Sequence, residues 1–65
     1  MKIKINGKVE EVEAVTIEQL ISDLGQPVNQ IVIDYNGAVV KREDWATKVL
    51  TEGASLEILK FVGGG

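Results

Sequence analysis

Two Asn-Gly dipeptides, Asn6-Gly7 and Asn36-Gly37, constrain the fold of this chain more than any other feature. Asn-Gly tolerates the positive φ angles of a tight two-residue turn and is typical of β-hairpins. Residues 2–6, which lead into the first turn, alternate polar and apolar side chains. The second dipeptide follows the β-branched run 31–33, as expected for a strand covered on both faces. The sequence therefore predicts two separate hairpins.

The segment between the hairpins has the pattern of a helix. Thr16 and Gln19 fit a capping box at its start, and Gly25 followed by Pro27 is a stop signal. The apolar residues of this segment recur at helical spacing and form one face, which we expect to be buried: Ile17, Leu20, Ile21 and Leu24.

Shorter elements complete the pattern. Residues 8–13 read as the second strand, with a bulge or strand end near Glu10-Glu11, and residues 38–41 read as the strand that returns from the second turn. Residues 42–45 predict a single helical turn, with Trp45 folded over the edge of the core.

The last strand, 55–62, carries apolar side chains on both of its faces. Leu56 and Ile58 share one face, and Leu59 and Phe61 share the other. One helix can cover only one face of a sheet, so we place Leu56 and Ile58 inside and expect the other pair on the open face.

The order strand, strand, helix, strand, strand, turn, strand is that of the β-grasp, the ubiquitin-like α+β fold. We expect a mixed sheet of about five strands, with the first and last strands parallel at its centre and one main helix packed on one face. The β-grasp domain would span residues 1–62, and residues 63–65 would form a flexible glycine tail.

Composition excludes most catalytic chemistry. The 65 residues include no Cys and no His, which removes thiolate nucleophiles, Cys-based metal sites and the commonest acid–base catalyst. A net charge of −3 without a basic stripe argues against nucleic acid as a partner. The start of the chain lacks the apolar run of a signal peptide, and no aliphatic run is long enough to cross a membrane. We therefore expect a soluble, cytoplasmic protein.

The order of elements, the short length and the end at Gly64-Gly65 make the chain resemble ubiquitin and the prokaryotic sulfur carriers, above all the ThiS family of thiamin biosynthesis. Four features carry this resemblance along the whole chain. These are the Asn6-Gly7 turn, the segment 40–45 that is similar to the family's Val-Pro-Arg-x-x-Trp, Gly53 before the last strand, and the ending 61–65. Lys41 replaces the usual proline, and Gly53-Ala54-Ser55 replaces the more usual Gly-Asp step.

The resemblance implies a carrier that is a protein co-substrate and not an enzyme. A ThiF-like adenylating partner would activate the carboxylate of Gly65 with ATP, and sulfur from a persulfide donor would replace AMP to give a thiocarboxylate. A ThiG-like thiazole synthase would then take the sulfur. ATP and Mg²⁺ would be bound by the adenylating partner, with no cofactor or metal held by this chain.

Within this reading, Gly63 and Gly64 give the tail access to a narrow channel because they lack Cβ atoms. Leu59, Phe61 and Val62 would form the partner-binding surface beside the tail. The alternatives are a tail that is only a disordered end or a linker, and a Leu59–Phe61 pair that packs against the Trp45 loop or a helix end. Trp45 is read as a core lid, and Glu43 and Asp44 as solvated charges.

Three other functions remain open from the sequence. The chain could be the small subunit of molybdopterin synthase, although such chains are usually longer, or a ubiquitin-like protein modifier. It could also be an interaction module with an inert terminus.

Overall fold

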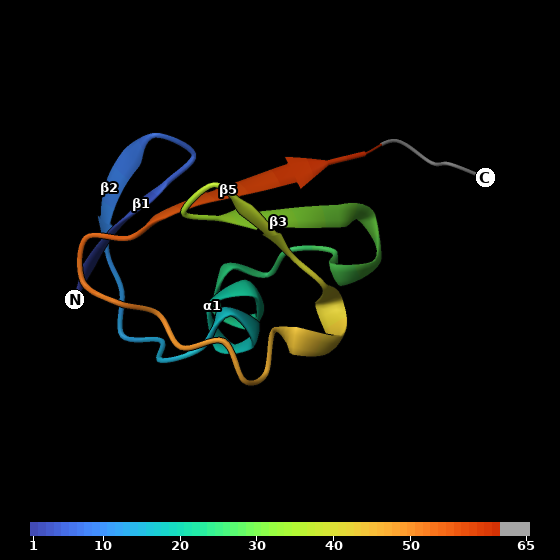
Figure 1. The fold of residues 1–65 in the computed structure, drawn as a ribbon, viewed down its shortest axis with the longest axis horizontal. Coiled ribbons are helices and arrows are strands. Elements are labelled where there is room, and N and C mark those ends of the chain that lie inside the picture. Colours follow the sequence, from blue (N-terminus) through green and yellow to red (C-terminus); the bar gives the residue numbers. More distant parts are fainter. Residues whose placement is uncertain (62–65) are drawn as a thin grey trace.

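A computed structural model describes residues 1–61, in which a mixed sheet is crossed on one face by a single α-helix (Figure 1). The predictions for Val62 and for the tail 63–65 fall outside the described residues. The elements follow in this order: β1 (Lys2–Ile5), β2 (Lys8–Glu11), α1 (Ile17–Leu24), the 3₁₀ turn η1 (Val28–Gln30), β3 (Ile31–Tyr35), β4 (Ala38–Val40), the 3₁₀ turn η2 (Arg42–Asp44) and β5 (Ser55–Lys60).

The five strands lie in the order β2-β1-β5-β3-β4. β1 and β5 are parallel, with Ile5 beside Leu56, and every other neighbouring pair is antiparallel. The first and last strands therefore meet inside the sheet, and β5 is its central strand. This arrangement confirms the predicted α+β, β-grasp architecture.

Helix α1 begins and ends where the sequence signals stand. The Thr16 Oγ1 accepts a hydrogen bond from the Gln19 N–H at 3.2 Å. Gln19 Oε1 reaches back one residue further than a capping box requires and accepts from the Val15 N–H at 3.0 Å. At the other end Gly25 adopts φ 67°, a left-handed conformation that suits glycine, and its N–H donates to the Ser22 carbonyl.

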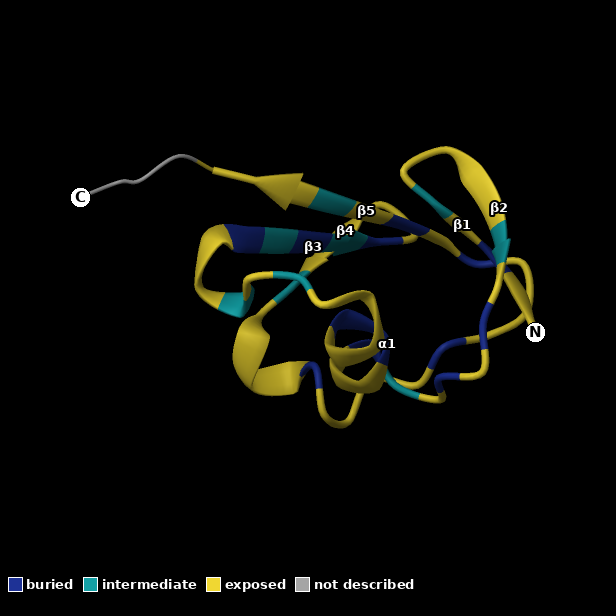
Figure 2. Cartoon of the chain, turned by 180° about the vertical axis from the view of Figure 1, so that it is seen from behind, coloured by how far each residue is buried: buried dark blue, intermediate teal, exposed yellow. Residues whose placement is uncertain are grey.

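The core lies between α1 and the covered face of the sheet, where buried segments of helix and strands meet (Figure 2). The largest fully buried side chains come from both layers: Ile3, Ile17, Leu20, Ile21, Ile33 and Leu56. Leu24 departs from the prediction, because it is 43% exposed and lines a surface groove beside Leu20.

Two side-chain hydrogen bonds fasten the long connection to the sheet. The buried Trp45 donates from Nε1 to the Val40 carbonyl at 3.0 Å, which confirms its role as a lid on the core. The Tyr35 hydroxyl accepts a hydrogen bond from the Thr51 N–H at 2.9 Å. The connection between η2 and β5 is thereby held against the sheet even though it contains little regular structure.

β3 differs from the prediction that it is covered on both faces. Ile31, Ile33 and Tyr35 are buried, whereas Val32 and Asp34 are only half-buried. The reason is that α1 covers one face alone, so the β-branched run 31–33 still alternates between a covered and an open side. The prediction that β2 stops near Glu10-Glu11 is confirmed, because the strand ends at Glu11.

Candidate functional site

The candidate site is built around the C-terminal end of β5, which points away from the N-terminus of the molecule (Figure 1). Both Asn-Gly turns hold this strand from its sides. Asn6 Oδ1 accepts a hydrogen bond from the Ile58 N–H at 2.7 Å, and Asn36 Oδ1 accepts one from the Ser55 N–H at 2.8 Å. Both asparagines take the left-handed backbone conformation that the turns require. The turns therefore shape the hairpins and also anchor the strand that precedes the tail.

Phe61 is held in place directly after β5. Its N–H donates to the Gln30 carbonyl at 3.0 Å, which extends the antiparallel pairing of β5 with β3 beyond Lys60. The chain is therefore fixed to the body of the domain up to Phe61. Val62, Gly63, Gly64 and Gly65, four of the residues predicted to form the site, lie outside the described residues.

The open face of the sheet carries exposed apolar side chains near this point. Leu59 is 51% exposed and Phe61 is 49% exposed, so packing within the domain leaves about half of each side chain open to solvent. Leu59 stands opposite Val32 in the pairing of β5 with β3. Val39 of β4 points to the same open face of the sheet and is 65% exposed. We call these four residues, Val32, Val39, Leu59 and Phe61, the outer patch.

A surface groove of about 320 Å³ adjoins the outer patch where β3 begins and β4 ends. We call it the β3–β4 groove. Most of its lining is apolar, including Ile31, Val39, Trp45 and Phe61, and its cationic residues are Lys41 and Arg42. Among the residues that the structure describes, no acidic side chain lines it.

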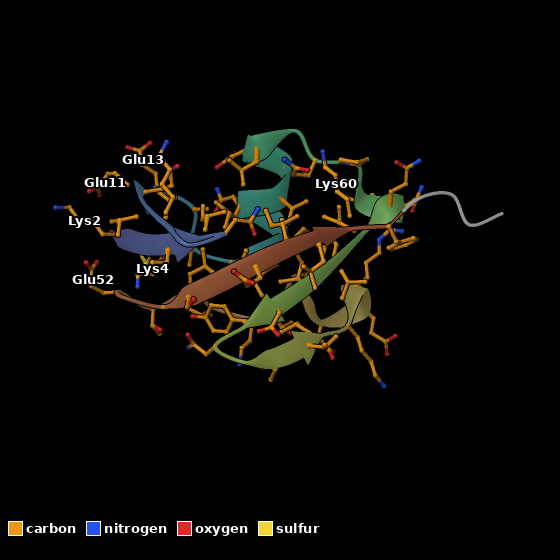
Figure 3. All side chains as sticks on the ribbon, turned by 90° about the horizontal axis from the view of Figure 1, so that it is seen from above. Lys2, Lys4, Glu11, Glu13, Glu52 and Lys60 are labelled. Carbon is orange, nitrogen blue, oxygen red and sulfur yellow. The ribbon has the colours of Figure 1, made fainter. Side chains whose placement is uncertain are left out.

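The opposite end of the molecule gathers most of the labelled charges in Figure 3, with Lys2, Glu11, Glu13 and Glu52 near the N-terminus. The Met1 ammonium donates to Glu11 Oε2 at 2.9 Å. This hydrogen bond is the main reason that the pKa of the ammonium is raised and the pKa of Glu11 is lowered. Lys60 is the labelled charge toward the end where β5 stops.

Within residues 1–61, no group of three or more His, Cys, Asp or Glu side chains could hold a metal ion. Glu43 and Asp44 are both exposed on the short turn η2. No helix in this range is long and apolar enough to cross a membrane. What the described residues provide is an apolar surface at Phe61, where the described part of the chain ends.

Two parts of the site were missed by reasoning from the sequence. Val32 and Val39 join the outer patch through strand register, which could have been counted outward from the two-residue turn at Asn36-Gly37. The meeting of Lys41 and Arg42 with Phe61 in one groove had no such signal, because it depends on how β4 leaves the sheet.

Comparisons with known proteins agree on one family. Residues 3–65 match the model of the ThiS family. The crystal structure of the thiamine biosynthesis protein (ThiS) from Geobacter metallireducens is similar over the full length of both chains, with 29% identity and a TM-score of 0.87. An NMR solution structure of a thiamine biosynthesis protein from the same organism gives a TM-score of 0.80 over all of this chain and 88% of that one.

Two curated relatives are much longer. A thiazole synthase of Magnetococcus marinus is 38% identical over the whole of this chain, and a thiazole synthase of Paramagnetospirillum magneticum is 33% identical. The chain spans about a fifth of the length of each of these relatives. The family-model match over residues 3–65 and the structural match over the full length of both chains together settle the assignment: the chain belongs to the ThiS family of small sulfur carrier proteins.

Proposed function

We propose that this carrier works through the carboxylate of Gly65, which a partner enzyme adenylates and then converts to a thiocarboxylate that donates sulfur for thiazole formation in thiamin biosynthesis. The observation that carries the proposal is the match of residues 3–65 to the ThiS family, a stretch that includes the three glycines 63–65. Support also comes from β5, which is the central strand and is anchored from both sides at Ser55 and Ile58, a few residues before the glycines in the sequence.

The chemistry explains why a partner is needed. A carboxylate is a poor electrophile because its charge repels nucleophiles and it lacks a good leaving group. In the first step the Gly65 carboxylate oxygen bonds to the α-phosphorus of ATP, and pyrophosphate leaves. A persulfide sulfur of the donor then bonds to the carbonyl carbon and AMP leaves. A thiol finally cleaves the sulfur–sulfur bond, leaving a thiocarboxylate on the carrier and a disulfide on the donor side.

The carrier supplies a reacting group and a way to deliver it. Glycine lacks Cβ, so the stretch 63–65 suits a narrow channel in which a bulkier residue would clash. ATP and Mg²⁺ belong to the adenylating partner in this scheme, because Mg²⁺ assists by neutralising the phosphate charge during transfer. The outer patch would give that partner an apolar surface to grip, next to the tail it must receive.

A thiazole synthase is the proposed acceptor of the sulfur. In both curated relatives a stretch similar to this chain occupies about a fifth of a protein named thiazole synthase. The occurrence of a carrier-like stretch within such proteins supports physical association between the two activities. For this chain the association would be between separate proteins or domains.

Intact-mass spectrometry tests the proposal. The full chain is incubated with a ThiF-like adenylating enzyme, MgATP and a persulfide donor, and we expect the mass to rise by the difference between sulfur and oxygen. Omission of ATP is the control and should abolish the change. An unchanged mass would contradict the proposal, provided that the adenylating enzyme is shown to be active on its own carrier.

Extension of the chain by one residue after Gly65 separates a working terminus from an inert one. The extended chain should fold as before and fail to gain sulfur, since the carboxylate would no longer be at the glycine. Sulfur transfer by the extended chain would contradict the role of Gly65. Complementation of a thiamin auxotroph, compared with a molybdenum-cofactor auxotroph, then checks which pathway receives the sulfur.

A further inference from the structure

We propose that the β3–β4 groove binds an extended segment of the activating partner in which an Asp or Glu side chain stands beside an apolar one. The inference rests on the function proposed above and adds to it the chemistry by which the partner is recognised. Its basis is a groove that combines apolar walls, cationic residues and a position at the root of the tail.

The groove exists because the ladder between β3 and β4 is short. Pairing stops at Ile33 and Val40, and the chain then turns into η2. Ile31 and Val32 line the groove where β4 no longer runs beside β3. A segment in extended conformation fits beside a strand whose neighbour has ended, as in other cases where a peptide adds to a sheet.

The walls of the groove provide apolar surface that the fold leaves open. Val39 and Phe61 both line it and are about half exposed or more, at 65% and 49%. Trp45 is a further lining residue, although it is almost fully buried. An apolar side chain from a partner would cover this surface and gain the free energy of its burial.

The charges in the groove determine which partner segment fits. Lys41 and Arg42 line it, whereas the whole chain has a net charge of −3. Glu43 and Asp44 follow in η2 but are not part of the lining. An acidic segment is therefore repelled by most of the surface and attracted here, which favours this orientation of docking.

The Arg42 guanidinium is already oriented. Its Nη1 donates a hydrogen bond to Asn29 Oδ1, and both residues line the groove. A guanidinium carries five N–H donors in a fixed plane, so one bond to Asn29 leaves donors for a carboxylate. A partner carboxylate would meet a cation whose position costs less entropy to fix than that of a free side chain.

The groove also lies within reach of the reacting group. Phe61 lines it, and Gly65 follows four residues later. Four residues span at most about 14 Å, so a partner held in the groove keeps its active site within that distance of Phe61. Recognition at the groove and delivery of the tail would therefore occur together.

Chemical-shift mapping on the full chain tests the groove directly. The probes are a short end-capped peptide of alternating Leu and Asp and a matched peptide with Lys in place of Asp. We expect the acidic peptide to shift the backbone amides of Val39, Lys41, Arg42 and Phe61, and less strongly at high salt. Equal shifts with both peptides, shifts that map elsewhere, or no shifts would overturn the inference.

Charge reversal supplies the second measurement. Lys41→Glu should weaken binding of the acidic peptide, and of the ThiF-like enzyme, by about tenfold, because an attraction becomes a repulsion. Lys8→Glu makes the same change of charge on a residue of the first hairpin and should alter binding by less than about twofold. Equal effects of the two variants would show a dependence on net charge alone and would count against the groove.

Two further outcomes are decisive. The first is self-association: without peptide, the chemical shifts of the same amides would change with protein concentration, and sedimentation analysis would show a dimer. In that case a second copy of the chain fills the groove and the inference fails. If the acidic peptide binds as expected while wild-type protein gains no sulfur, the groove stands as an acidic-segment site and its assignment to an activating partner fails. The mass assay uses the wild-type chain and the peptide mapping uses no enzyme, so the two failures are distinguishable.

Discussion

Asn6 and Ile58 are joined by a hydrogen bond of 2.7 Å from the Ile58 N–H to the Asn6 side-chain oxygen, across 52 residues of sequence. Parallel pairing of β1 with β5 stops at Ile5 and Leu56, and the Asn6 N–H still donates to the Leu56 carbonyl. The asparagine side chain then satisfies the next free amide of the central strand. Asn6 therefore has two roles: it forms the turn of the first hairpin, and its side chain pairs with β5 where β1 has ended.

Replacement of Asn6 by Gly should isolate this second role. Glycine keeps the positive φ of 52° without strain but cannot accept from Ile58, so we expect a loss of about 1–2 kcal/mol of unfolding free energy. Asn6→Asp is the matched control, because it retains an acceptor in the same place. Urea denaturation of both variants provides the comparison, and equal stability of Asn6→Gly and wild type would contradict the anchoring role.

Trp45 closes the core, so its removal should be severe. Trp45→Ala deletes a side chain that is 3% exposed and should cost about 3–5 kcal/mol, a large part of the stability of so small a domain. Trp45→Phe keeps an aromatic ring but loses the hydrogen bond to the Val40 carbonyl, and should cost roughly 1–3 kcal/mol. Circular dichroism during thermal unfolding measures both, with the exposed Val39→Ala as control. A Trp45→Ala variant as stable as Val39→Ala would show that the lid does not support the core.

Most of the fold could be predicted from the sequence because its signals are local. The turn residues Asn6 and Asn36, the cap Thr16 and the stop Gly25 each specify a conformation within a few neighbours, and the structure confirms all four. Leu56 was placed in the core and Leu59 outside it because a single helix can cover only one face of the sheet. This prediction is also confirmed. Local signals of this kind leave little freedom to a chain of 65 residues.

The remainder depends on where segments meet in space. Val32 was expected to be covered because a β-branched run has the same sequence pattern whether one or both faces of the strand are buried. The structure decides between the two, because α1 covers only one face of the sheet and Val32 lies on the other. The β3–β4 groove requires the exact point at which β4 leaves β3. The glycines 63–65, in contrast, were identified by resemblance alone, and their role stays a prediction.

The Met1–Glu11 ion pair should make stability depend on pH in a defined window. The pKa of the ammonium is raised above its ordinary 8.0, so its contribution is complete below that value and is lost as the pH rises through the folded pKa. The pKa of Glu11 is lowered from its ordinary 4.5, so its contribution is present above that value and is lost as the pH falls.

Glu11→Gln should therefore lower the melting temperature most between about pH 5 and pH 8, with a smaller difference on either side. The effect should be modest and should shrink at high salt, because both groups are exposed to solvent. Thermal scans of the two proteins across this range measure it. A difference that does not change with pH would mean that Glu11 acts through packing and not through its charge.

Phe61→Ser tests the outer patch against a matched site on the same face of the sheet. Val9 is 58% exposed on the edge strand β2, where it pairs with Lys4 on the open face, while Phe61 is 49% exposed beside the tail. Because both side chains are half exposed, Phe61→Ser and Val9→Ser should each change stability only slightly, by roughly 0.5–1 kcal/mol. Only Phe61→Ser should reduce kcat/KM for adenylation, by about tenfold or more, since an apolar anchor at a protein interface typically contributes over 1 kcal/mol.

Pyrophosphate release in the presence of the adenylating enzyme measures the rate. Equal losses of kcat/KM in the two variants would mean that the enzyme contacts the whole open face of the sheet. No loss in either variant would mean that the enzyme recognises the tail alone.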